Sequence, residues 1–175
     1  MDIFVIFIKD ADNIKPELLE QFRFKRISNP QKLKEHCFAY LMLDRILKDV
    51  YKIGSRELIF VNNKPYLKNR QKFFSISHSE EYTAIGFSDT ECGIDIEKVK
   101  NRDYKSIAKR MNFVCNNLEE FYQCWTKYEA EYKLGKTSES FYQNIINDYI
   151  LTAVSKNSQE EFNIYIQNGE TFPNL

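Results

Sequence analysis

Two carboxylates stand two residues apart in a short, otherwise apolar segment. On a β-strand, side chains two residues apart share a face, so Asp95 and Glu97 point to one side while Ile94 and Ile96 point to the other. We expect the isoleucines to face the core, which leaves both acids together on the opposite face. Such a pair is more often a solvent-facing pair on an edge strand, so it does not predict a site by itself.

A third carboxylate lies in a segment with helical spacing, residues 117–134. At about 100° per residue, several apolar side chains of this segment fall on one stripe. They are Leu118, Tyr122, Trp125 and Tyr132. Glu129 falls on the same stripe, where a carboxylate is unfavourable unless it is paired or bound to a metal. Either a Lys or Arg partner, a stripe that ends at Trp125, or a Mg²⁺ site shared with Asp95 and Glu97 would account for it, because Mg²⁺ prefers oxygen ligands.

The elements that must position these acids can be read from hydrophobic patterning. Strands are expected at 2–9, 57–61, 72–77, 82–88, 92–97, 148–155 and 161–167. Helices are expected at 16–24, from Pro30 to about 53 with Gly54 as its terminator, and at 103–112, 117–134 and 138–147. Short links between the strands favour antiparallel pairing, so the pattern predicts an α+β fold.

Composition limits the classes of partner. Lys and Arg total 25 and Asp and Glu total 25, so no net charge draws the chain to nucleic acid or to a membrane surface. No segment approaches the ~20 apolar residues of a membrane helix. The four cysteines, Cys37, Cys92, Cys115 and Cys124, form no CxxC pair, and only two histidines are present, so a zinc site is not expected. Unpaired cysteines of this kind suit a reducing, cytoplasmic location.

Four short blocks resemble the motifs of Sfp-type 4'-phosphopantetheinyl transferases. Residues 93–97 (GIDIE) are similar to the family's G-[IV]-D-[IV]-E signature, and residues 125–133 (WTKYEAEYK) to its W-x-x-K-E-A-x-x-K helix. Residues 74–79 (FSISHS) resemble its F-[NS]-[IL]-S-H-S strand end, and 63–67 (NKPYL) its G-K-P-x-[LF] turn. The blocks occur in the family's order, and the resemblance covers about residues 22–136.

The resemblance implies a pseudo-twofold fold of two similar α/β lobes, each with a mostly antiparallel sheet and a packed helix. The lobes would span 1–90 and 91–175, with the active site between them. It implies a magnesium enzyme that transfers the phosphopantetheine arm of coenzyme A to a serine of an apo acyl or peptidyl carrier protein, releasing adenosine 3',5'-bisphosphate. A cytoplasmic monomer, with no nucleic-acid or membrane partner, is expected.

The same resemblance assigns roles to individual residues. Magnesium would be bound by Asp95, Glu97 and Glu129, and the catalytic group would comprise Glu129, Asp95 and Lys133. Coenzyme A would be held by Lys25, Arg26, Lys64, Ser77, His78 and Lys133. Either a carboxylate or a metal-bound water would take the proton from the carrier serine. The alternative readings are a structural histidine at a strand end for His78, a turn residue for Lys64, and a solvated helix start for the basic stretch.

The chain also departs from the family pattern. Tyr128 stands where the family usually has lysine, although Lys127 is adjacent, and the segment between Glu97 and Trp125 is short. These departures leave open a non-catalytic relative that binds coenzyme A or a carrier. A metal-dependent nuclease is a third reading, which the neutral charge and the Ser-His-Ser block disfavour.

Overall fold

The computed structural model describes residues 1–8, 17, 21, 27–54 and 57–167. Within them the helices are α2 (Pro30–Asp49), α3 (Tyr104–Met111) and α4 (Leu118–Leu134). The strands are β1 (Asp2–Phe7), β2 (Leu58–Val61), β3 (Lys64–Leu67), β4 (Phe73–Ser79), β5 (Tyr82–Ser88), β6 (Cys92–Lys98), β7 (Ser140–Ile146), β8 (Tyr149–Ser155) and β9 (Asn163–Gln167). The fold is mixed α+β, as the sequence predicts.

The strands form three sheets with mainly antiparallel pairing. A four-stranded sheet has the order β4-β5-β1-β9, a three-stranded sheet has the order β6-β8-β7, and β2 pairs with β3 in a hairpin. All strand pairs are antiparallel except β1 and β9, which run parallel with Asp2 opposite Asn163. The end of the described chain therefore completes the sheet that its beginning starts.

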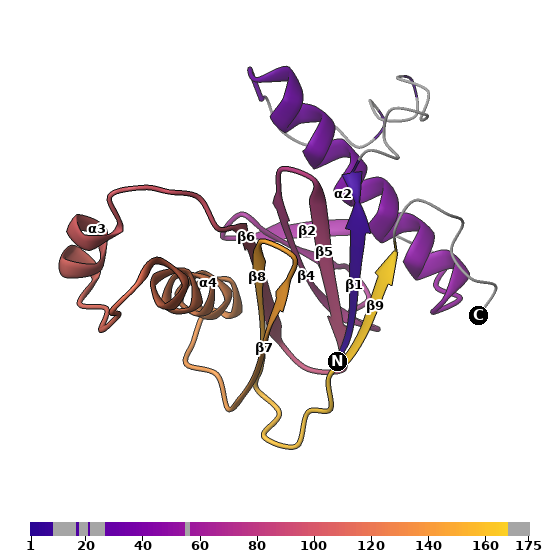
Figure 1. Ribbon diagram of the computed structural model, residues 1–175. Coiled ribbons are helices and arrows are strands. Elements are labelled where there is room, and N and C mark those ends of the chain that lie inside the picture. Colours follow the sequence, from indigo (N-terminus) through magenta and orange to yellow (C-terminus); the bar gives the residue numbers. More distant parts are fainter. Residues whose placement is uncertain (9–16, 18–20, 22–26, 55–56, 168–175) are drawn as a thin grey trace.

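The two larger sheets and two helices stack as four layers (Figure 1). A core of buried side chains from β1, β5, β6 and β8 fills the space between the sheets. On the outer face of the four-stranded sheet, Phe4, Ile6, Ile85 and Phe87 pack against α2. On the outer face of the three-stranded sheet, β8 packs against α4. Each sheet therefore has one helix covering the face that the other sheet does not.

Serine side chains join the neighbouring edge strands β4 and β6. Ser75, Ser77 and Ser79 alternate along β4 on the face that carries Gly86, Ala84 and Tyr82 of β5. The Oγ of Ser75 accepts the Ile94 N–H at 3.1 Å, and that of Ser79 accepts the Lys98 N–H at 3.2 Å. An edge strand needs partners for its backbone groups, so these hydroxyls satisfy amides of β6 and fix the edge strands of the two sheets together.

Helix α2 starts as predicted and ends earlier. Asn29 caps it by accepting the Lys32 N–H at 3.0 Å, and Pro30 occupies its first turn. The prediction that it runs to about 53 and stops at Gly54 is wrong. The helix ends at Asp49, and Lys52, with a φ of 55°, turns the chain before the glycine.

The expected helix at 138–147 is also wrong, because this segment forms β7. Its residues pair with β8 across a tight hairpin, from Ser140 opposite Ser155 to Ile146 opposite Tyr149. Asn147, at the hairpin, has the positive φ of 55° that asparagine tolerates well. The expected helix at 16–24 lies outside the described residues. None of the described helices is long and apolar enough to cross a membrane.

Candidate functional site

Gly93 allows α4 to lie directly on β6. A Cβ atom on Gly93 would come within 2.9 Å of the Ala130 carbonyl carbon and 3.1 Å of the Leu134 nitrogen, closer than side chains normally approach backbone. Only a glycine leaves room for the helix backbone here. The helix residues on either side of this contact, including Glu129 and Lys133, are therefore held close to the strand that carries Asp95 and Glu97.

The buried face of α4 differs from the predicted apolar stripe. Its buried residues are Phe121, Tyr122, Thr126, Ala130 and Leu134. Of the predicted stripe only Tyr122 is buried, and Tyr132 is 74 % exposed. Small and polar groups decide this orientation, because the helix rests on Gly93 through Ala130 and because Thr126 bonds to Thr152 of β8 at 2.7 Å. Glu129 consequently lies half-buried beside the strand acids rather than among apolar neighbours.

Asp95 is the centre of the polar contacts. It is only 4 % exposed, and its Oδ1 accepts hydrogen bonds from the Ser77 hydroxyl at 2.7 Å and the Lys133 ammonium at 2.8 Å. Lys133 also donates to the Ile94 carbonyl at 3.0 Å. The other carboxylate oxygen, Oδ2, is buried and has no hydrogen-bond partner among the described residues. A buried carboxylate oxygen without a donor is unfavourable unless a ligand supplies one.

Negative charge is crowded around Asp95. Burial raises the pKa of the Glu97 carboxyl, and the charge of Asp95 raises it further, while hydrogen bonds from Ser79 and Trp125 and the charge of Lys133 act in the opposite direction. Burial likewise raises the pKa of Glu129, again helped by Asp95 and opposed by Lys133. The acids of β6 and α4 therefore repel one another in the folded protein, with one lysine as counter-charge.

This donor set partly fits a divalent cation. The unpartnered buried oxygen of Asp95 and the repulsion of Asp95 with Glu97 and with Glu129 would both be relieved by a hard cation such as Mg²⁺. Across the described part of the chain, however, no three His, Cys, Asp or Glu side chains are already grouped to hold a metal ion. Lys133 meanwhile supplies the positive charge next to Asp95. The acids are thus near one another but are not arranged as a complete set of metal ligands.

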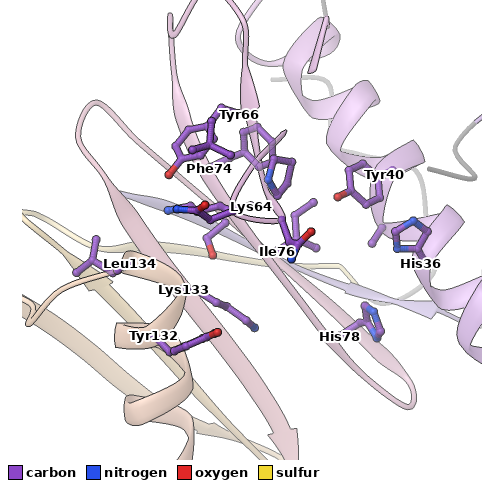
Figure 2. Close-up of a pocket in the computed structure, with 17 residues that line it drawn as sticks. His36, Tyr40, Lys64, Tyr66, Phe74, Ile76, His78, Tyr132, Lys133 and Leu134 are labelled. Atoms are coloured by element: carbon purple, nitrogen blue, oxygen red, sulfur yellow. The ribbon is translucent and has the colours of Figure 1, made fainter. Parts of the chain in front are cut away.

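A cavity of about 580 Å³ opens beside this cluster. It is lined by residues of α2, of the β2–β3 hairpin, of β4 and of the end of α4. Among them are Lys64, His78 and Lys133, together with His36, Tyr40, Tyr66, Phe74 and Ile76. Figure 2 shows Tyr132 and Lys133 reaching in from α4, opposite His36 and Tyr40 on α2. Lys133 therefore belongs both to the cavity wall and to the acidic cluster.

The two other predicted cavity residues already have acidic neighbours. The Nζ of Lys64 lies 3.0 Å from Glu91 Oε2, and it also donates to the Cys92 carbonyl at 3.2 Å. The Nδ1 of His78 lies 3.3 Å from Glu35 Oε2. Burial raises the pKa of the Glu35 carboxyl, and Gln31 opposes this with a hydrogen bond. Sequence reasoning missed Glu35, although a carboxylate on the buried face of a long helix is the same signal that singled out Glu129.

The structure brings most of the predicted site residues together. Ser77 and Lys133 both donate hydrogen bonds to Asp95, and the charge of Asp95 raises the pKa of the Glu97 and Glu129 carboxyls. Lys64 and His78 line the adjacent cavity. Ser77 contacts Asp95 rather than the cavity lining. Lys25 and Arg26 lie outside the described residues.

Comparison with known proteins does not assign this chain to a family. No protein-family model matches the chain, and no curated protein sequence matches it either. The resemblance to phosphopantetheinyl transferases therefore rests on the four sequence blocks alone.

Proposed function

We propose that the protein is a magnesium-dependent 4'-phosphopantetheinyl transferase acting on an apo acyl or peptidyl carrier protein. The observation that carries this proposal is the convergence of all four sequence blocks on one place. The turn with Lys64, the strand end with Ser77 and His78, the strand with Asp95 and the helix with Lys133 are far apart in sequence. They meet at one cavity and the acidic cluster on its edge.

The cavity is suited to the nucleotide part of coenzyme A. Its volume of about 580 Å³ falls within the usual range of small-ligand sites. Tyr66 and Phe74 offer flat apolar surface, while Lys64, His78 and Lys133 offer positive charge or hydrogen-bond donors for phosphate. A hydrogen bond to a charged group contributes roughly 1.5–3 kcal/mol. These side chains would therefore bind and orient the phosphate groups of coenzyme A, with His78 near the 3'-phosphate and Lys133 near the pyrophosphate.

The acidic cluster is suited to the reacting end of the substrate. When bound, Mg²⁺ would neutralise charge on the pyrophosphate, and Asp95, Glu97 and Glu129 would hold it. Lys133 joins Asp95 to the cavity and would bring positive charge to the phosphates. Ser77 holds Asp95 in place through its hydroxyl. A carboxylate with a raised pKa, as for Glu97 and Glu129, accepts a proton more readily than an ordinary one, so either could take the proton of the carrier serine.

We infer in addition that the four-layer stack represents the two α/β lobes of this family. The four-stranded sheet with α2 would be one lobe, and the three-stranded sheet with α4 the other. The cavity borders both α2 and α4, which supports a substrate held between lobes. If the lobes divide near residue 90, β9 follows the second lobe in sequence but belongs to the sheet of the first, because it pairs with β1. The enzyme would act as a cytoplasmic monomer.

Incubating the protein with an apo carrier, coenzyme A and Mg²⁺, followed by mass spectrometry of the carrier, tests the proposal. The carrier serine should gain the phosphopantetheine arm, and chelating the metal should prevent this. Tyr128 favours one alternative, a relative that binds coenzyme A without transferring it. Calorimetric binding of coenzyme A with no modification of any of several fatty-acid, polyketide and peptide-synthesis carriers would establish that alternative and reject the transferase.

A further inference from the structure

Two cysteines outside the acidic cluster meet at the start of α4. Cys115 lies in the segment 112–117 that connects α3 to α4, and Cys124 lies on the second turn of α4. The Sγ of Cys124 donates a hydrogen bond to the Val114 carbonyl at 3.9 Å. Because that carbonyl belongs to the peptide bond leading into Cys115, the contact brings the Cys124 sulfur to the backbone of Cys115.

Both thiols are open to chemistry that the other cysteines are not. Cys115 and Cys124 are half-buried, whereas Cys37 and Cys92 are 1 % and 0 % exposed. Val114, beside Cys115, is 91 % exposed, so reagents can reach the segment from solvent. Burial raises the pKa of the Cys124 thiol, and negative charge on Cys115 raises it further.

The connecting segment holds Cys115 outside regular secondary structure. A disulfide requires its two Cα atoms to lie roughly 4.4–6.8 Å apart. Residues 113–115 form neither helix nor strand, while Phe113 bonds to Ala108 and Asn116 bonds to Glu120 on either side. Cys115 thus sits on a short span anchored at both ends, above a rigid helix.

We propose that Cys115 and Cys124 form a reversible intramolecular disulfide that fastens the 112–117 segment to α4. With hydrogen peroxide as oxidant, one thiolate attacks a peroxide oxygen to give a sulfenic acid and, after protonation, water. The second thiol then displaces hydroxide from that sulfur, so two thiols and one peroxide become one disulfide and two waters. A dithiol reductant reverses the bond by exchange. This site lies beyond the proposed transferase activity and does not depend on it.

The full chain can be tested without coenzyme A or a carrier. After brief treatment with hydrogen peroxide, free thiols are blocked with an alkylating reagent under denaturing conditions and the protein is digested for mass spectrometry. A peptide cross-linked between Cys115 and Cys124 is expected, with Cys37 and Cys92 recovered as alkylated thiols. Reduction with dithiothreitol before blocking should remove the cross-link.

Trp125 provides a second readout, because it is the chain's single tryptophan and adjoins Cys124. Its emission should change on oxidation and recover on reduction in the parent, and should do neither in Cys115→Ser or Cys124→Ser. Sulfinic acids on separate cysteines, or disulfides between two chains, as the main products of the parent protein would overturn the proposal. This chemical result stands even if a serine variant folds poorly.

Discussion

The two long helices cover equivalent faces of the two sheets and do so with different chemistry. Helix α2 buries eleven of its residues, and nine of these are Cys, Phe, Ala, Tyr, Leu, Met or Ile. Helix α4 buries five, with Thr126 in their middle, and places Glu129 and Lys133 beside the strand. One helix is therefore fixed mainly by apolar packing, whereas the other is fixed partly by hydrogen bonds and one ion pair.

The difference concerns how precisely each helix is positioned. Apolar contacts have no preferred direction, whereas hydrogen bonds set both distance and direction. Thr126 bonds to Thr152, and Gln143 donates to Thr152 at 2.7 Å, so α4, β7 and β8 share one polar contact. Lys133 of α4 makes a second such contact, because it donates a hydrogen bond to Asp95 of β6. Directional contacts as well as hydrophobic burial therefore hold helix α4 at the acidic cluster. The proposed roles of Glu129 and Lys133 require such fixed positions.

The largest expected effect comes from removing the charge of Asp95. Asp95→Asn should lower carrier modification at least about 100-fold, because loss of a metal ligand should exceed the usual loss of an outer-shell partner. Its melting temperature should change little, since loss of the Lys133 pair is offset by relief of repulsion with Glu97 and Glu129. Transfer rates and thermal unfolding of the same preparations measure both.

Leu47→Ala on α2 is the matched control, because it should lower stability and leave activity unchanged. Leu47 is fully buried, so its truncation should lower the free energy of unfolding by about 2–5 kcal/mol. The folded fraction should retain its specific activity. Near-parental transfer by Asp95→Asn, or a large loss of specific activity in folded Leu47→Ala, would remove the functional distinction between the two helices.

The close approach of α4 to β6 gives the next effect. Gly93→Ala places a methyl group against the α4 backbone and should destabilise the protein by about 1–3 kcal/mol, as overpacking does. Gly54→Ala is the control, because nothing lies within 4 Å of its added Cβ, and it should stay within about 0.5 kcal/mol of the parent. Urea unfolding of the two variants compares them. Equal stabilities would mean that α4 can lift from the strand without penalty.

These contacts also show what the sequence could and could not predict. The α+β fold class and the strand nature of β6 followed from local patterning and are confirmed. Strand β7 was read as a helix because its half-exposed residues alternate poorly, and only pairing with β8 makes it a strand. The parallel pairing of Asp2 with Asn163 joins residues too far apart in sequence for any local pattern to reveal.

The sequence predicted that certain candidate residues lie close together, but not which contacts they make. The spacing of Asp95 and Glu97 places them on one face, and the structure puts α4 over that face. The buried side of α4 was misread because the helical stripe counted only apolar residues. Thr126 and Ala130 orient the helix instead, through partners on β8 and β6. Glu35 was missed because its neighbour His78 lies on a strand 43 residues further along the chain.

A smaller effect is expected on the α2 side of the cavity. His78→Ala should raise the KM for coenzyme A about tenfold, in line with one lost charge-assisted contact of roughly 1.5–3 kcal/mol, and should leave the carrier KM less affected. Lys68→Ala is the charge control, since Lys68 pairs with Glu57 in an exposed salt bridge. Steady-state kinetics with coenzyme A and with dephospho-coenzyme A test this. An equal loss with dephospho-coenzyme A would rule out contact between His78 and the 3'-phosphate.

The pH dependence of stability reports on the α4 side. The pKa of the Glu97 carboxyl is raised above 4.5 in the folded protein, so the folded state loses stability as pH rises through that pKa. Glu97→Gln should therefore have a higher melting temperature than the parent at neutral pH. The increase should be roughly 2–4 °C for each kcal/mol of unfavourable electrostatic free energy that is removed. The advantage should shrink as the pH falls toward 4.5. In an Asp95→Asn background the gain from Glu97→Gln should be smaller, because the Asp95 charge contributes to the raised pKa of Glu97. A gain in melting temperature that grew on acidification would contradict repulsion between these carboxylates.

The smallest effect concerns Tyr128, where the family has lysine. Its ring lies 6.0 Å from that of Phe113 and 6.3 Å from that of Trp125, and it is partly exposed. The neighbouring Lys127 does not replace the missing charge, because its Nζ lies over the Phe141 ring at 4.6 Å, toward β7. Tyr128→Lys should therefore raise kcat a few-fold while the KM for coenzyme A stays nearly constant, the pattern of a charge that acts in the transition state.

Tyr128→Met separates charge from packing in that experiment. Both substitutions lose the ring contacts, each worth about 0.5–1.5 kcal/mol when well packed and less at a partly exposed site, so both should lower the melting temperature slightly. Only lysine should accelerate single-turnover transfer. If lysine and methionine lower the melting temperature equally and neither raises the rate, Tyr128 serves only to pack α4 against Phe113. Helix α4 would then contribute to the reaction solely through Glu129 and Lys133.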